Sequence, residues 1–288
     1  MSETGIDLDQ LRTWVGRTET RTDLATAVQM AAMSATLDRD DSNPVPGTVV
    51  PPLWHWLYFL PLSPMSEAGP DGHPKRGGFL PPVPLPRRMF AGGRFEFRHP
   101  LRIGDAISRT SRITDVSGKQ GRSGTLVFVT VRHEIANGAG VALTEEHDIV
   151  YRENPRPDAP VPTPTQAPTG ETFRREIAPD PVLLFRYSAL TFNSHRIHYD
   201  RSYVTEVEGY PGLIVHGPLI ATLLVDLLRR SLPEVTVARF SFRAVRPLFD
   251  IHRFCVCGRR EGKSVGLWAR DHQGWLAMEA SADRKSVV

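Results

Sequence analysis

The most constraining stretch of this 288-residue chain is an apolar run from Leu219 to Leu228. Apolar residues fill nearly every position of the run, so a helix here would be apolar all round and would have to be buried on every side. The preceding Pro218 suits the first position of a helix, because its missing N–H would have no partner there and its φ is already helical. The sequence therefore predicts a buried central helix that starts at or near Gly217.

The start of this helix is a candidate thioester-binding element. The first N–H groups of a helix have no partner inside the helix and carry partial positive charge, so they suit an oxygen that gains negative charge. Gly217 has no Cβ, which lets such an oxygen approach the backbone closely. His216, directly before it, is expected to support the loop. A plain loop-to-helix stop explains the same His-Gly-Pro step equally well.

A dense group of polar residues precedes the helix in the segment FNSHRIHYD, residues 192–200. His198 is the first candidate for proton transfer, because an imidazole near its ordinary pKa of about 6.5 exchanges protons at neutral pH. Asn193 is a candidate for orienting water or a thioester by hydrogen bonds, or else a turn residue. His195 and Arg196 are either substrate-binding residues or ordinary surface residues of the loop.

Composition excludes several classes of protein. With 40% hydrophobic and 23% charged residues, the chain fits neither a disordered nor a fibrous protein. A formal charge of +3 without long basic blocks argues against a nucleic-acid partner. No apolar stretch approaches the roughly 18 residues of a membrane span, and the acidic start is unlike a signal peptide, so we expect a cytoplasmic protein. Two cysteines without matching histidines give no zinc pattern, so no metal site is predicted.

Two groups of strands are predicted from alternating and β-branched residues, at 95–152 and 235–283. Between them, residues 153–170 contain six prolines and no apolar periodicity, which is typical of a linker of polyproline II character. The sequence therefore predicts antiparallel sheet on either side of a proline-rich linker.

The two sides of the linker share an order of landmarks that indicates an internal duplication. Val45–Leu53 matches the order of Tyr210–Leu219, and a Ser-Ala pair precedes each. The predicted domains are an N-terminal repeat (1–152), the linker and a C-terminal repeat (171–288). Between the matching landmarks only the second copy carries histidines. We therefore expect the N-terminal repeat to be non-catalytic and to supply a partner surface and part of the substrate channel.

Some residues of the N-terminal repeat are also candidates. Arg87 and Arg88 could meet an acyl or phosphate anion, although charge at a strand edge explains them equally well. His55, between two tryptophans, is expected in the core, and His73 in a loop.

The polar segment and the helix start together resemble a known family. FNSHRIHYD followed by GLIVHGPL (212–219) resembles the MaoC-like (R)-specific hydratases and type 2 hydroxyacyl-thioester dehydratases. RRMFAGGRFEF (87–97) resembles the N-terminal repeat of their double hot-dog members. The resemblance covers roughly residues 20–285 and is more specific in the second half. It implies an α+β double hot-dog fold, in which two antiparallel sheets, each wrapped around a central helix, form one continuous layer.

The resemblance also assigns roles to the polar segment. In the family's usual motif an Asp and a His five residues later act on water, with an Asn between them. On this chain Asn193 stands at the Asp position, His195 at the Asn position and His198 at the His position. An amide cannot take a proton, so this departure leaves His198 as the proton-transfer group of the motif. The helix start after His216 and Gly217 is similar to the family's thioester-binding element.

The implied activity is that of a hydro-lyase, which adds or removes water across the α,β-bond of an enoyl-CoA thioester. Similarity to the members that act on mesaconyl-CoA and itaconyl-CoA favours a short branched dicarboxylic substrate such as mesaconyl-C4-CoA. Arg196, with Arg87 and Arg88, supports that expectation. The expected partner is acyl-CoA. A homodimer is compatible with the resemblance, and no cofactor is expected beyond the substrate's coenzyme A, since the sequence has no glycine fingerprint or ligand cluster.

Other functions stay open at this point. A general 3-hydroxyacyl-thioester dehydratase and an itaconyl-CoA hydratase are close alternatives. Hot-dog folds also serve thioesterases, for which Asp200 and Asp226 are the nearest carboxylates, and a non-catalytic acyl-binding subunit is the third class.

Overall fold

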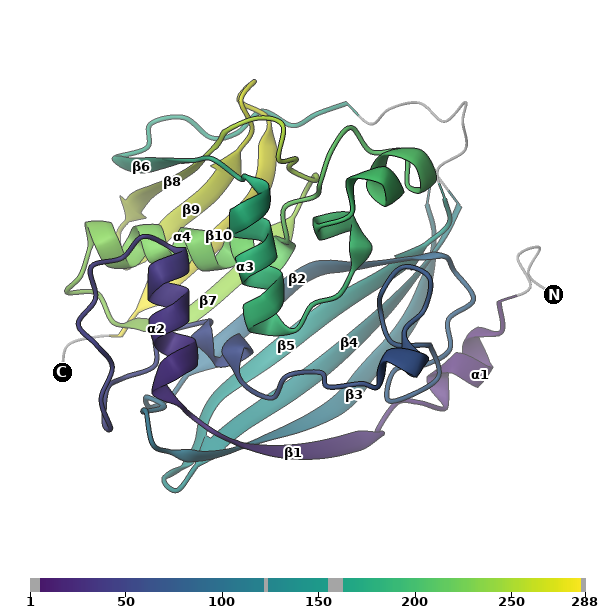
Figure 1. Cartoon of the computed structure of the whole chain (residues 1–288), viewed down its shortest axis with the longest axis horizontal. Coiled ribbons are helices and arrows are strands. Elements are labelled where there is room, and N and C mark those ends of the chain that lie inside the picture. Colours follow the sequence, from purple (N-terminus) through teal and green to yellow (C-terminus); the bar gives the residue numbers. More distant parts are fainter. Residues whose placement is uncertain (1–5, 122–123, 155–162, 286–288) are drawn as a thin grey trace.

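The computed structural model describes residues 6–121, 124–154 and 163–285. Within them the strands form one ten-stranded antiparallel sheet in the order β1-β3-β4-β5-β2-β7-β10-β9-β8-β6 (Figure 1). Five neighbouring strands come from each half of the chain, so the two halves share one layer as expected. The strands are β1 (Thr18–Leu24), β2 (Arg87–Phe97), β3 (Ala106–Gly121), β4 (Gly124–Asn137), β5 (Gly140–Arg152), β6 (Phe173–Ile177), β7 (Val237–Ala244), β8 (Phe254–Glu261), β9 (Ser264–Arg270) and β10 (Leu276–Arg284).

The two halves join where β2 pairs with β7, with Phe95 opposite Phe240. Gly92 lies at a break in the register between β2 and β5. A Cβ on Gly92 would lie 2.6 Å from the carbonyl oxygen of Phe242. A side chain there would push β2 and β7 apart, so this glycine allows the sheet to continue from one half into the other.

The predicted central helix is α4 (Gly217–Ser231), and its residues 219–228 are all buried. It starts at Gly217, with Pro218 in its first turn. The corresponding place in the N-terminal half holds only the 3₁₀ helix η1 (Trp54–Leu57), because prolines bracket that apolar stretch and prevent a longer helix. The fold therefore has one long central helix and one reduced to a single short turn.

A second pair of helices lies across the boundary between the halves. α2 (Ala27–Thr36) packs beside α3 (Pro181–Thr191) (Figure 1). Asp180 caps α3 by accepting a hydrogen bond from the N–H of Leu183. Phe192 ends α3 in the left-handed conformation, and this turns the chain into the polar segment. The remaining short helices are α1 (Leu8–Arg12), η2 (Met65–Glu67), η3 (Arg196–His198) and η4 (Tyr203–Val207).

The predicted linker is described only in part. Its residues 155–162 lie outside the described residues, whereas 163–170 run along the sheet of the C-terminal half. The N–H of Leu276 donates to the carbonyl of Thr165, and buried Ala167 packs in a cluster with Trp268. The last part of the segment is therefore fixed to the second half. Among the described helices, none combines the length and apolar character needed to span a membrane.

Candidate active site

A cavity of about 690 Å³ is lined by residues from both halves of the chain. The N-terminal half contributes most of residues 69–76 and 84–89, and the C-terminal half contributes His195, Ile197 and residues of the segment 203–210. Basic side chains outnumber acidic ones in its lining, which suits an anionic ligand. The charged residues are Lys75, Arg76, Arg87, Arg88, Asp71 and Glu208.

His198 is buried in η3. Its neighbours His195 and Ile197 line this cavity, whereas His198 itself is not among the lining residues. Its Nδ1 lies 2.7 Å from the carbonyl oxygen of Ile214. A carbonyl only accepts, so Nδ1 carries the hydrogen and Nε2 of the neutral ring has a free lone pair. Burial lowers the pKa of His198 to about 4, although the hydrogen bond to Ile214 acts in the opposite direction. At neutral pH the ring is therefore uncharged and can accept a proton through Nε2.

His216 supports His198 from the start of α4. The two imidazole rings stack with centroids 3.6 Å apart, and Nε2 of His216 lies 2.8 Å from Oγ of Ser188. Burial lowers the pKa of His216 well below its ordinary value. Next to it, a Cβ on Gly217 would meet no atom within 4 Å, so the space there is open. An oxygen of a ligand can therefore approach the first turn of α4.

The structure separates the roles of Asn193 and His195. Oδ1 of Asn193 accepts the backbone N–H of His195 at 3.0 Å, and the N–H of Asn193 donates to the carbonyl of Ser188. Asn193 thus shapes the turn after α3 and is not among the residues that line the cavity. His195 does line it, with its ring centroid 5.5 Å from that of His198.

Two of the predicted arginines are held by the protein itself. Arg196 lies over the ring of Tyr203 and forms an ion pair with Asp200 at 2.8 Å, outside the cavity lining. Arg87 lines the cavity but donates to the hydroxyl of Tyr210 and to the backbone carbonyl of Glu208. Both side chains therefore organise the walls of the site.

Arg88 differs from these two arginines. It lines the cavity and forms no ion pair with any carboxylate of the described residues. Burial lowers the pKa of both His73 and His195, and the positive charge of Arg88 adds to this effect. Of the predicted substrate-binding arginines, Arg88 is thus the one without a carboxylate partner among the described residues, and its guanidinium lies near the hydroxyl of Tyr151.

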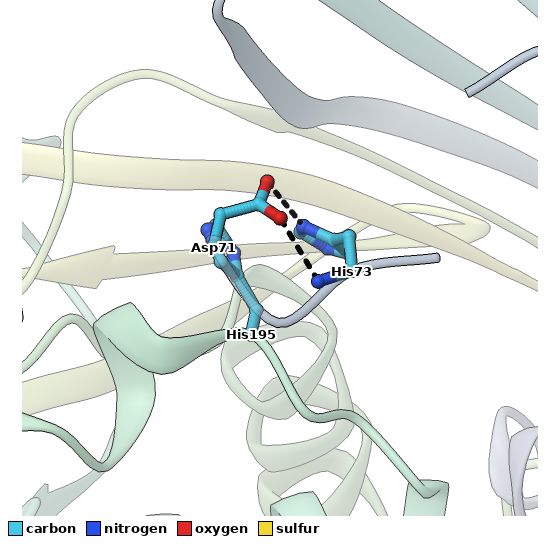
Figure 2. A group of neighbouring side chains, drawn as sticks. All are labelled: Asp71, His73 and His195. Atoms are coloured by element: carbon cyan, nitrogen blue, oxygen red, sulfur yellow. Dashed lines mark hydrogen bonds and ion pairs between the residues drawn. The ribbon is translucent and has the colours of Figure 1, made fainter. Parts of the chain in front are cut away.

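Sequence reasoning missed two residues that the structure brings into the site, Asp71 and His73 (Figure 2). The ring of His73 lies 4.0 Å from that of His195, and Oδ2 of Asp71 lies 3.2 Å from Nδ1 of His73. His73 is in a loop, as expected, but the loop belongs to the cavity wall. One signal was available: the irregular stretch from 58 to 86 is longer than loops in compact domains usually are, and such loops are commonly functional.

The same three side chains are close enough to share a metal ion. Asp71, His73 and His195 each bring a potential ligand atom within 4.8 Å of the others. A second such group, His133, Glu145 and His147, lies in the N-terminal half. The expectation of a site without metal therefore stays a prediction.

Comparison with known proteins identifies the family. The model of the family described as hydroxyacyl-thioester dehydratase type 2 matches residues 53–250, which include the Asp71 loop, the polar segment and both strands of the sheet junction, β2 and β7. The chain belongs to this family. One relative is the mesaconyl-C(4)-CoA hydratase of Chloroflexus aurantiacus, which is 49% identical over 273 residues that cover 94% of this chain and 96% of that protein. The mitochondrial hydroxyacyl-thioester dehydratase type 2 of Schizosaccharomyces pombe is 26% identical and covers 77% of this chain and 80% of its own.

Solved structures confirm the fold of this chain. A MaoC-like dehydratase from Phytophthora capsici superposes with a TM-score of 0.69 at 15% identity, over 98% of this chain and 99% of that one. A Mycobacterium tuberculosis protein described as having a double hotdog fold superposes with a TM-score of 0.58 at 14% identity, over 99% and 100% of the two chains. The predicted α+β double hot-dog is therefore confirmed, and so is the predicted family.

Proposed function

We propose that this enzyme is a hydratase of a short branched dicarboxylic enoyl-CoA, with mesaconyl-C4-CoA as its substrate. The Chloroflexus aurantiacus hydratase, with its 49% identity over nearly the full length of both chains, supports the choice of substrate. The structural observation that carries the proposal is a buried neutral His198 with a lone pair on Nε2, stacked on His216 at the start of α4 and close in sequence to His195 and Ile197, which line the basic cavity. Hydration needs a group that stabilises the thioester oxygen and a group that accepts a proton from water. The N-terminus of α4 supplies the first and the imidazole of His198 the second.

The reaction follows from these parts. Water bonds to the β-carbon through its oxygen, and one of its protons passes to Nε2 of His198. The electron pair of the double bond moves toward the thioester carbonyl, whose oxygen gains negative charge. The first N–H groups of α4, beside Gly217, stabilise that oxygen, and one such donor contributes about 3 to 4 kcal/mol to a transition state. The imidazolium then returns the proton to the α-carbon, so one water is added and the enzyme is unchanged.

The free carboxylate of the substrate is assigned to Arg88. The other basic side chains of the cavity already have partners: Lys75 donates to the carbonyl of Ser66, and Arg76 to carbonyls of the 83–86 segment. A guanidinium without a carboxylate partner gives a charge-assisted, two-point contact to a carboxylate. This feature favours a dicarboxylic acyl group over a plain fatty chain.

A thioesterase is less well supported, because the nearest carboxylates outside the cavity are already engaged. Asp200 accepts hydrogen bonds from Arg196, and the fully buried Asp226 accepts from three arginines. Neither is free to attack a thioester. A general dehydratase or an itaconyl-CoA hydratase would use the same machinery and differs only in the acyl group.

The proposal requires no metal or redox cofactor and no partner besides acyl-CoA. Metal analysis of the purified protein and an activity assay after dialysis against a chelator test the first point. Light scattering tests for the homodimer that the resemblance admits.

A thioester panel tests the activity and the acyl group together. Purified enzyme is mixed with mesaconyl-C4-CoA, itaconyl-CoA, crotonyl-CoA and a longer enoyl-CoA, and ultraviolet absorbance and free thiol are followed. We expect loss of the conjugated absorbance without thiol release, fastest for mesaconyl-C4-CoA. Thiol release would identify a thioesterase, absence of any reaction would identify a binding protein, and faster turnover of crotonyl-CoA would identify a general hydratase.

A further inference from the structure

The polar segment of the C-terminal half lacks a carboxylate directed at the cavity. Asn193 is an amide whose Oδ1 is used in a turn, and Asp200 is bound by Arg196. His198 sits among buried, uncharged groups, so nothing in this segment would stabilise an imidazolium formed during the reaction. A carboxylate that stabilises such an imidazolium would come from another part of the chain.

The loop that carries Asp71 is fastened directly to the polar segment. The N–H of Arg196 donates to the carbonyl of Asp71 at 2.9 Å, and Oγ of Ser194 donates to the carbonyl of Gly72 at 2.5 Å. The guanidinium of Arg196 adds a third hydrogen bond, to the carbonyl of Pro70 at 3.0 Å. Two segments more than a hundred residues apart in sequence are thus held in one arrangement.

Gly72 shows how close this contact is. Its φ is +87°, a conformation that residues with side chains rarely adopt. A Cβ at this position would lie 1.9 Å from the carbonyl oxygen of Ser194. Only glycine fits between Asp71 and His73, so the placement of these two side chains is a built feature of the fold.

The hydrogen bonds of Asp71 fix the orientation of His73 (Figure 2). One carboxylate oxygen accepts the backbone N–H of His73 at 3.0 Å, and the other lies 3.2 Å from Nδ1 of the ring. With Nδ1–H directed at Asp71, Nε2 of the neutral ring has the free lone pair. Both His73 and its neighbour His195 line the cavity. Besides Asp71, the charged groups that act on His73 are Arg76 and Arg88.

We propose that Asp71 and His73 form the second proton-transfer group of the active site, and that Asp71 supplies from the N-terminal half the carboxylate that Asn193 lacks. His73 is the catalytic residue of this pair, and Asp71 is a positioning residue that acts through it. This inference deepens the proposed function and rests on it. It also makes the N-terminal half part of the catalytic machinery, against the sequence-based expectation.

The chemistry balances with one water. The water donates one hydrogen bond to Nε2 of His198 and the other to Nε2 of His73, and its oxygen bonds to the β-carbon. The proton that leaves the water passes to one of the two imidazoles, and when it passes to His73 the carboxylate of Asp71 stabilises the positive charge on that ring. The proton then passes to the α-carbon, and both rings return to the neutral form.

The test compares Asp71→Asn, His73→Ala and the control Glu67→Gln, each in the full-length enzyme with mesaconyl-C4-CoA. Glu67 is an exposed carboxylate in the same loop region, so the control removes the same charge outside the cavity. We expect kcat to fall about 10- to 100-fold for Asp71→Asn and at least 100-fold for His73→Ala, within the range of general acid–base catalysis. KM should change little, and Glu67→Gln should match wild type.

Two further readouts separate catalysis from a structural role. Asp71 raises the proton affinity of His73, so the acidic limb of kcat/KM against pH should move to lower pH in Asp71→Asn. Added imidazole should restore part of the activity of His73→Ala. Loss of activity with an unmoved pH limb and no rescue would assign Asp71 and His73 a structural role and overturn the inference.

The remaining outcomes also decide the question. If wild type hydrates mesaconyl-C4-CoA and Asp71→Asn and His73→Ala keep wild-type kcat, the inference fails while the proposed function stands. If wild type hydrates no thioester of the panel, the proposed function itself fails. Activity that is lost on dialysis against a chelator and restored by zinc would replace the proton-transfer pair by a metal centre.

Discussion

The imidazole rings of His198 and His216 stack with their centroids only 3.6 Å apart, and both are buried. Two neutral rings can pack in this way without cost from charge. A proton on either ring would place a buried positive charge against its neighbour, with no carboxylate of the described residues in ion-pair contact with His198 or His216. The stack therefore stabilises the uncharged state that proton acceptance requires, and it links the site to the stability of the fold.

This link predicts a loss of stability in mild acid. The pKa of His198 is about 4 in the folded protein and about 6.5 when unfolded, so above pH 6.5 neither state binds the proton. As pH falls from 6.5 to 4, His198 binds a proton in the unfolded state but stays neutral in the folded state. The free energy of unfolding therefore drops by on the order of 3 kcal/mol. Urea unfolding of wild type at pH 7.5 and 5 should show about 2 kcal/mol of this drop, since pH 5 covers only the upper 1.5 units of the interval. In His198→Gln the drop should be smaller, whereas the exposed His252→Gln should behave as wild type; equal slopes in all three would contradict the assignment.

The role of His198 in proton transfer is tested by His198→Ala. We expect kcat to fall about 10²- to 10⁴-fold, as for loss of a general acid–base group. His252→Ala is the matched control, because it removes one ring of another close histidine pair, His252–His272, whose ring centroids lie 3.8 Å apart on the surface. A His198→Ala enzyme that is folded by circular dichroism and still hydrates at nearly the wild-type rate would rule out the assignment.

Asn193 has a narrower expected role. Its Oδ1 accepts the N–H of His195, so Asn193→Ala should loosen the segment and lower kcat by roughly 10-fold, the equivalent of about one hydrogen bond. Asn193→Asp keeps an acceptor oxygen at the same place and should retain measurable activity. Steady-state rates of the two variants decide between a positioning role and none, and equal activity of Asn193→Ala and wild type would leave Asn193 without a function in the reaction.

Local pattern predicted much of this fold. The all-round apolar run gave α4 and its start at Gly217, because a helix of that composition has no solvent-facing side. Alternation gave most of the long strands. The edge strand β6 was not predicted, because most of its five residues are charged and it shows no apolar alternation. Charged residues are usual on a protected sheet edge.

The site was predictable in its C-terminal part and at Arg87 and Arg88, which line the cavity from the N-terminal half. His198 and His195 lie in one short segment with a recognisable motif, so a single stretch of sequence reveals them. Asp71 and His73 act on that segment through contacts such as Gly72 against Ser194, which depend on one φ value and one carbonyl. Hydrophobic periodicity in the sequence gives no information on a contact between segments so far apart. The role proposed for Asp71 and His73 rests on the three-dimensional structure.

Arg88 should determine the preference for a dicarboxylic substrate. We expect Arg88→Ala to lower kcat/KM for mesaconyl-C4-CoA by about 10- to 100-fold, the effect of losing a charge-assisted contact of roughly 1.5 to 3 kcal/mol. Crotonyl-CoA, which has no free carboxylate, is the internal control and should be affected much less. An equal loss of kcat/KM for both thioesters would show that Arg88 supports the cavity wall without binding the substrate's carboxylate.

Asp226 should matter for stability and not for the reaction. Its side chain is fully buried in α4 and forms ion pairs with Arg39 at 2.5 Å, Arg175 at 3.0 Å and Arg230 at 2.7 Å. Arg39 comes from the N-terminal half, so this cluster ties α4 to both halves. Removing the carboxylate leaves three guanidinium groups without their shared partner, and breaking a buried ion pair in this way typically costs about 3 to 5 kcal/mol.

Asp226→Asn should therefore lower the urea midpoint strongly, whereas the exposed Asp283→Asn should not. Because Asp226 touches no part of the cavity lining, kcat per folded molecule should stay close to wild type. The opposite result, a stable Asp226→Asn protein without activity, would mean that the carboxylate takes part in the chemistry. In that case the thioesterase alternative, which needs a carboxylate beside α4, would have to be reconsidered.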